Sequence, residues 1–188
     1  MVYGLVGRSG SGKSTAAEVF AERGFFVVDC DKVAAQVLLT DESVKNALAE
    51  AFGSDVLVGG EVDKKLVAER AFADRESLGL LNSITHPPIL AKLAAICAEH
   101  EKTLLDAPTL FESGADKLCD VIIAVTAPEE ACETRLLARD GASPEAIRRR
   151  LAMQKSEDFL RENADVVLEN NGGEAEFRRL VENVAQTL

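Results

Sequence analysis

The stretch MVYGLVGRSGSGKST, residues 1–15, places a glycine-rich turn directly after a short apolar run. The run Val2 to Val6 predicts a buried strand, and the residues from Lys13 to Arg23 predict a helix that stops at Gly24. The turn between them, Gly7 to Ser14, matches the pattern G-x-x-x-x-G-K-[ST] in full. The order strand, turn, helix is the context that this phosphate-binding pattern requires.

Each residue type in the turn suits phosphate chemistry. Glycines let the backbone wrap closely around a phosphate and aim N–H groups at it, and the start of the following helix adds partial positive charge. Lys13 supplies a full positive charge to the β- and γ-phosphates, and the Ser14 hydroxyl can bind Mg²⁺. We therefore predict a nucleoside triphosphate site with Mg²⁺ as cofactor, formed by Gly7, Gly10, Ser11, Gly12, Lys13, Ser14 and Thr15.

Composition narrows the class of protein and of partner. A chain of 188 residues suits one α/β domain with a small added lobe. The formal net charge of -11 disfavours nucleic acid as a partner. No apolar stretch is long enough for a membrane span or a signal peptide, so we expect a cytoplasmic protein without a membrane partner. The four cysteines and two histidines lack zinc-site spacing, which predicts reduced thiols.

Short apolar strands alternate with helical patterns along the rest of the chain. Helical spacing dominates Lys32 to Cys97, where we expect no strand. The other strands are expected at Phe25 to Asp29, Thr103 to Ala107, Asp120 to Val125 and Asp165 to Glu169. This alternation predicts an α/β fold in three layers around a five-stranded parallel sheet.

Three helices are predicted in the C-terminal half. Pro128 stands where the first turn of a helix to about Ala138 would be, and Ser143 is an expected N-cap with Pro144 at the first helical position. A terminal amphipathic helix is expected from Glu174 to Gln186.

Asp29 and Asp31 close the second predicted strand. Ligands of an open parallel sheet gather beyond the carboxyl ends of its strands, so these carboxylates are expected to face the same crevice as the phosphate loop. A carboxylate there can orient an acceptor hydroxyl and take its proton. The alternative for Asp31 is the N-cap of a helix that starts near Lys32, and for Asp29 a functional and a structural role both stay open.

Two kinds of nucleotide-binding protein are disfavoured. No NKxD-type guanine-binding sequence follows a later strand, and the chain is short for a large mechanical ATPase. A small phosphotransferase remains. The alternatives are another small-molecule or nucleotide kinase of the same fold, and a P-loop module that binds nucleotide without phosphorylating a metabolite.

From Val2 to the turn after Asn171 the chain resembles the dephospho-CoA kinase family. The resemblance rests on the ordered motifs GRSGSGKST, VVDCD, THPPI, LLDAPTLFE, RLLARD, AMQ and ADVVLENNG. It implies a P-loop kinase that transfers the γ-phosphate of ATP to the ribose 3′-hydroxyl of dephospho-CoA, the last step of coenzyme A biosynthesis. It also implies a core (about 1–31, 101–127 and 163–188), a helical substrate-binding insert (about 32–100) and a helical lid (about 128–162).

The same resemblance implies catalytic and metal-binding residues. Asp31 would be the general base, and Arg139 the lid arginine that acts on the phosphates together with Lys13. Asp106 ends the third strand as a Walker-B acid does, so it would hold Mg²⁺ through water, while the Ser14 hydroxyl would bind the ion itself. The partners would be ATP and dephospho-CoA, and the chain is expected to be a monomer or a weak homo-oligomer.

Binding residues follow from the resemblance as well. The residues that would bind dephospho-CoA are Asp31, His86, Phe111 and Gln154. The turn that contains Asn170 and Gly172 would lie beside the adenine of ATP. For His86, a structural role at a helix start ahead of two prolines is an open alternative. The sequence departs from the family pattern at Arg8 and Ser9 in the loop, at Thr109 in place of leucine, and at Lys64 in place of arginine.

Overall fold

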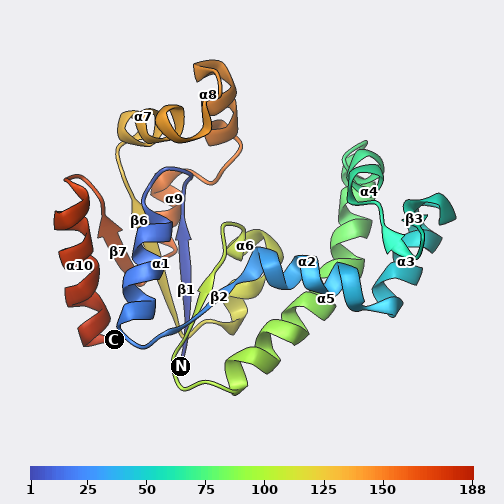
Figure 1. The fold of residues 1–188 in the computed structure, drawn as a ribbon, viewed down its shortest axis with the longest axis horizontal. Coiled ribbons are helices and arrows are strands. Elements are labelled where there is room, and N and C mark those ends of the chain that lie inside the picture. The colour runs from blue at the N-terminus through green and yellow to red at the C-terminus, as the bar shows by residue number, and fades with distance from the viewer. The chain divides into compact units, whose positions relative to one another are not determined.

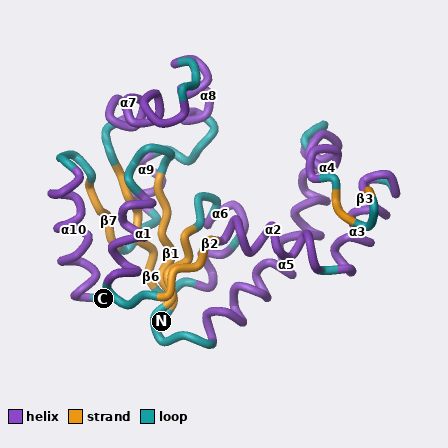
Figure 2. Tube along the Cα trace, viewed as in Figure 1, coloured by secondary structure: helices purple, strands orange, loops and turns teal.

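Five strands form one parallel sheet in the order β2-β5-β1-β6-β7. Their bounds are β1 Val2–Gly7, β2 Phe26–Asp29, β5 Thr103–Asp106, β6 Val121–Thr126 and β7 Val166–Glu169. The computed structural model describes all of residues 1–188. Figure 2 shows strands of this sheet in orange, among them β1, β2, β6 and β7. The predicted α/β class and five-stranded parallel sheet are confirmed.

The chain divides into two compact units, Met1–Val28 with His100–Leu188, and Asp29–Glu99. The first unit contains most of the sheet and the helices α1 Lys13–Glu22, α6 Leu110–Ser113, α7 Glu129–Asp140, α8 Pro144–Ala152, α9 Glu157–Glu162 and α10 Glu174–Thr187. A 3-10 turn, η2, covers Ala115–Leu118. The division of the chain into core, substrate insert and lid stays a prediction.

Helices cover both faces of the sheet in the first unit. On one face α1 and α10 pack against each other and bury a core that includes Tyr3, Phe20, Phe25, Leu104 and Phe177. On the other face α6, η2 and α9 contact β1 and β6. The helices α7 and α8 lie together beyond the carboxyl ends of the strands (Figure 1). The three predicted layers are therefore present.

Helix ends follow the local chemistry that the sequence shows. Gly24 adopts φ 89° directly after α1, as its predicted role at the helix end requires. The Ser143 hydroxyl accepts a hydrogen bond from the Ala146 N–H, which confirms this N-cap. Pro128 is the N-cap residue of α7 and lies just outside the helix, because α7 begins one residue later than the sequence suggests.

The second unit consists of α2 Cys30–Thr40, α3 Glu42–Phe52, α4 Lys64–Ala71 and α5 Arg75–Ala98, with a 3-10 turn η1 at Ser54–Val56. Val44, Leu48, Val56 and Ala71 are central to its core. The prediction that this region has no strand is wrong: β3 Leu57–Val58 and β4 Glu61–Val62 form a short antiparallel hairpin. Gly59 and Gly60 have positive φ values, so this pair forms a two-residue hairpin turn.

Gly4 allows α6 and η2 to approach the sheet closely. A Cβ atom on this buried residue would lie 2.7 Å from Leu110 Cδ2 and 2.8 Å from Cys119 Sγ. We expect Gly4→Ala to lower the free energy of unfolding by about 1–3 kcal/mol, because overpacking forces neighbours out of position.

Urea unfolding measures this effect, with Gly79→Ala as the matched control. Gly79 lies within α5 and has no atom within 4 Å of an added Cβ, so alanine there should raise the free energy of unfolding by roughly 0.5–1 kcal/mol. Equal effects of the two substitutions would contradict the close packing at Gly4.

Candidate functional site

Residues 7–12 join β1 to α1 in a tight loop whose conformation favours glycine. Gly10 and Gly12 have φ values of 81° and 105°. No side chain caps α1, and the first backbone bond at its start joins the Ala16 N–H to the Gly12 carbonyl. The N–H groups of Lys13, Ser14 and Thr15 therefore have no acceptor in the helix and are available to an anion.

Lys13 forms an ion pair with Asp106, at the carboxyl end of β5. The two side chains are mostly buried, at 15% and 21% exposure. The pairing places the predicted phosphate-binding cation beside the predicted metal-binding acid. Leu5 of β1 is in register with Asp106 of β5, and Lys13 begins the helix that follows β1. Strand pairing and the intervening loop together therefore bring Lys13 and Asp106 to one edge of the sheet.

The oxygen atoms at this edge suit magnesium. No group of three or more His, Cys, Asp or Glu side chains able to hold a metal ion is present. Mg²⁺ usually takes only one or two protein oxygens and completes its coordination with water and substrate phosphates. The exposed Ser14 hydroxyl and the Asp106 carboxylate fit that requirement.

A cleft of about 290 Å³ lies over the phosphate loop. The loop lines one side, including Gly7, Gly10, Gly12, Lys13, Ser14 and Thr15, and the helices α7 and α8 contribute Arg135, Arg139 and Arg150. Three arginines beside free backbone N–H groups make this cleft attractive to a polyphosphate, although the whole chain is acidic.

Arg139 is held at the cleft by the residue that follows it. Its guanidinium donates to the Asp140 carboxylate at 2.6 Å, and Arg150 donates to the same carboxylate at 2.9 Å. The hydrogen bond from Arg139 lowers the pKa of Asp140 and raises that of Arg139. Arg139 stays 59% exposed, so its remaining donors are accessible to a ligand.

Asn170 contacts the loop at Ser11. Asn170 is buried, and its amide donates to the Ser11 carbonyl at 2.8 Å. Ser11 is also buried, and its N–H donates to the Arg8 carbonyl inside the loop. Both residues therefore support the shape of the loop, and their predicted contact with ATP stays a prediction.

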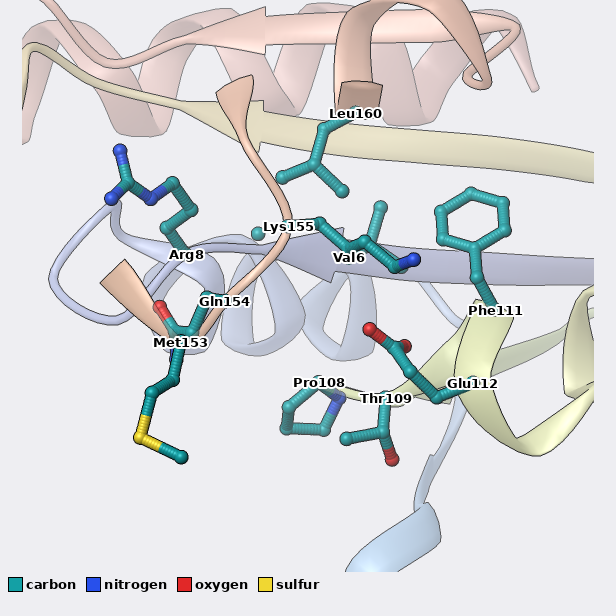
Figure 3. A pocket seen from close by; sticks show the side chains of 11 residues that line it. Val6, Arg8, Pro108, Thr109, Phe111, Glu112, Met153, Gln154, Lys155 and Leu160 are labelled. Atoms are coloured by element: carbon teal, nitrogen blue, oxygen red, sulfur yellow. The ribbon is translucent and has the colours of Figure 1, made fainter. Parts of the chain in front are cut away.

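A second pocket, of about 120 Å³, adjoins the loop and contains Phe111. Figure 3 shows Glu112 and Lys155 reaching into the same space as the Phe111 ring. Phe111 packs edge-to-face on Phe159, with ring centroids 5.2 Å apart. Thr109, one of the departures from the family pattern, also lines this pocket. An aromatic ring beside one carboxylate and one ammonium group, from Phe111, Glu112 and Lys155, suits a polar ligand with an aromatic part.

Gln154 lies where this pocket and the cleft meet, and lines both. Its carbonyl oxygen accepts from the Ser9 N–H at 2.9 Å, and its amide donates to the Ser9 hydroxyl at 2.8 Å. The predicted contact of Gln154 with the acceptor is untested, and the structure commits its polar atoms to the loop.

Comparisons with known proteins agree with this geometry. A family model described as dephospho-CoA kinase matches residues 1–176. The chain belongs to the dephospho-CoA kinase family. A dephospho-CoA kinase from Corynebacterium glutamicum is 38% identical over 175 residues, which cover 90% of this chain and 88% of the relative.

Two solved structures share this fold, and one of them is a dephospho-CoA kinase. A crystal structure from Thermus thermophilus is 32% identical in sequence and matches with a TM-score of 0.83. The match covers 100% of this chain and 97% of the Thermus chain. Dephospho-CoA kinase from Campylobacter jejuni has 27% identity and a TM-score of 0.73, with coverage of 98% and 95%. The predicted family and the predicted class, a kinase, are confirmed.

In this member of the dephospho-CoA kinase family, Asp29 and not Asp31 caps α2. The Asp29 carboxylate accepts from the Lys32 N–H at 3.0 Å. A hydrogen bond from the Lys32 side chain also lowers the pKa of Asp29. Asp31 is exposed in the first turn of α2. The alternative that Asp31 is the cap is therefore wrong, because α2 begins at Cys30, two residues earlier than expected.

The structure corrects the expected place of His86, and the predicted adenine contact of Gly172 stays a prediction. His86 is within α5, which continues through Pro87 and Pro88, so it is not at a helix start. Gly172 lies in the exposed turn after β7 and lines a separate hollow with Glu176 and Arg179. The structure does not bring Gly172 into the cleft over the phosphate loop.

Two arginines that are not among the predicted site residues also face the loop. Arg135 donates to the Gly10 carbonyl at 3.0 Å, and Arg8 lines both the cleft and the second pocket. Arg135 precedes Arg139 by four residues, so both lie on one face of α7. This spacing indicates from the sequence that Arg135 faces the same site as Arg139. No sequence pattern singles out Arg8, because the loop pattern accepts any residue at its position.

His86 makes stability depend on pH. It is half-buried, and burial lowers its pKa. Between its unfolded and its folded pKa the unfolded chain binds more protons, so the free energy of unfolding should fall as pH drops below about 6.5. We expect His86→Gln to reduce that dependence, measured by urea unfolding between pH 7 and 5. Parallel pH profiles for the two proteins would contradict the prediction.

Proposed function

We propose that this chain transfers the γ-phosphate of ATP to the ribose 3′-hydroxyl of dephospho-CoA and so completes coenzyme A. One observation supports the proposal most strongly: in a member of the dephospho-CoA kinase family, a loop with free N–H groups faces a cleft that Arg139 also lines. Phosphoryl transfer needs little covalent chemistry from a protein. Positioning and charge stabilisation account for most of it.

The loop and the lid would act on the donor. The N–H groups of Lys13, Ser14 and Thr15 bind phosphate oxygens, and Lys13 exchanges its ion pair with Asp106 for the β- and γ-phosphates. Arg139 adds a planar cationic group that can donate two parallel hydrogen bonds to the transferred phosphoryl group. The lid excludes water from the cleft, which limits hydrolysis of ATP.

Mg²⁺ belongs to the same proposal. It would be held by Ser14 and, through water, by Asp106, and when bound it neutralises charge that develops on the phosphates. ATP as the donor, a cytoplasmic location and a monomeric or weakly associating state stay predictions. No helix is both long and apolar enough to cross a membrane.

The acceptor would be activated by Asp31. This residue follows β2 by two positions, and the carboxyl ends of parallel strands form the edge at which ligands bind. Because Asp29 provides the helix cap, the Asp31 carboxylate remains available to accept a proton from the 3′-hydroxyl. His86 and Phe111 stay predicted contacts of dephospho-CoA.

We expect the chain with Mg-ATP to phosphorylate dephospho-CoA in preference to adenosine and nucleoside monophosphates. Phosphorus NMR of the product identifies the 3′-phosphate, and Lys13→Ala should abolish transfer because charge stabilisation at the phosphates is lost. Phosphate on another member of the panel, with none on dephospho-CoA, would refute the acceptor. Unchanged turnover of Lys13→Ala would refute the site.

Asp31→Asn should lower kcat by ~10²-fold or more and leave the affinity for ATP near that of the natural chain, because only the proton acceptor is removed. Asp29→Asn is the matched control, since asparagine caps a helix as well as aspartate and kcat should hold. Steady-state kinetics and calorimetry of ATP binding separate the two effects. A loss of ATP binding with normal kcat would exclude Asp31 as the base.

A further inference from the structure

The helix pair α7 and α8 lies within the predicted lid, and both ends of this pair meet at Arg8 of the phosphate loop. Its Nη1 donates to Glu129 Oε2 at 3.0 Å, at the start of α7, and its Nη2 donates to the Leu151 carbonyl at 3.1 Å, near the end of α8. The Arg8 side chain is only 15% exposed. The Arg8 side chain therefore connects the start of α7 with the end of α8.

Gln154 adds a second connection, two residues after α8 ends. It binds Ser9 at two points, as acceptor from the backbone N–H and as donor to the hydroxyl. This paired geometry fixes both the position and the orientation of the Ser9 peptide. Because the Ser9 N–H donates to Gln154, this donor is already occupied, unlike the N–H groups at the start of α1.

The rest of the loop is held in the same way. Arg135 of α7 donates to the Gly10 carbonyl at 3.0 Å and to Asn170 Oδ1 at 3.4 Å, while Asn170 donates to the Ser11 carbonyl. Consecutive residues from Arg8 to Ser11 are thus restrained by side chains or carbonyls of other elements. The free N–H groups at the start of α1 are the part left for a ligand.

We propose that Gln154 is a positioning residue for the nucleotide: it acts through Ser9 and, with Arg8, joins the phosphate loop to both ends of the lid. The loop and the lid arginines then meet the phosphates as one preorganised body. This inference rests on the proposed function and differs from the sequence prediction, which assigns Gln154 to the acceptor. Arg8 and Ser9, both departures from the family pattern, are the loop residues that form these contacts.

The test replaces the amide by an apolar group of the same length, Gln154→Met. Loss of two hydrogen bonds that shape the loop should raise the Kd for Mg-ADP, measured by calorimetry, and the KM for ATP by roughly tenfold. The KM for dephospho-CoA should change less than twofold. Hydrogen exchange of the Ser9 amide, followed by NMR, should become fast because its acceptor is gone.

Two further variants separate positioning from general damage. Gln154→Glu keeps an oxygen that faces the Ser9 N–H, so exchange of this amide should stay slow. Arg178→Gln removes ion pairs of 2.8 Å and 3.6 Å to Glu22 and Glu18, which join α10 to α1 away from the cleft. This control should leave the Kd for Mg-ADP and the Ser9 exchange rate unchanged.

The outcomes are distinguishable from those for the proposed function. A raised KM for dephospho-CoA with unchanged Mg-ADP affinity and slow Ser9 exchange in Gln154→Met would overturn the inference and support the acceptor role. Fast Ser9 exchange in Gln154→Glu would also overturn it. If the natural chain fails to phosphorylate dephospho-CoA, the proposed function fails, yet calorimetry and hydrogen exchange still decide the role of Gln154.

Discussion

The unpartnered N–H groups at the start of α1 are the constraint around which the first unit is organised. A helix start normally obtains hydrogen bonds from a capping side chain, and here Gly12 occupies that position with a positive φ and no side chain. At the end of a phosphate-binding pattern, open donors of this kind can bind an anion. The buried strand β1, the glycine turn and the packing of α1 on α10 hold the donors in place.

Charge at the site is local and opposes the charge of the whole chain. The net charge is -11, yet Lys13, Arg135, Arg139 and Arg150 surround one cleft. Acidic partners hold these cations in position: Asp106 pairs with Lys13, and Asp140 pairs with Arg139 and Arg150. An acidic surface with a cationic cleft directs a polyphosphate to one place and repels nucleic acid elsewhere.

Hydrogen bonds join the phosphate loop to the helix pair α7 and α8. Arg8 contacts the start of α7 and the end of α8, Gln154 contacts Ser9, and Arg135 contacts Gly10. These contacts restrain consecutive loop residues from Arg8 to Gly10, so the shape of the loop depends on side chains that come from outside it.

Local sequence determined the strand–loop–helix unit, the five strands and the family, because periodicity, glycine placement and motif order are properties of neighbouring residues. The hairpin at residues 57–62 was not predicted from the sequence, because strands of two residues are too short to show an alternating apolar pattern. Tertiary structure alone decided which residues meet: that Asp29 caps α2, that Asn170 supports Ser11, and that Gln154 binds Ser9 across 145 residues of chain. Such pairings depend on how elements pack, and no spacing within either segment encodes them.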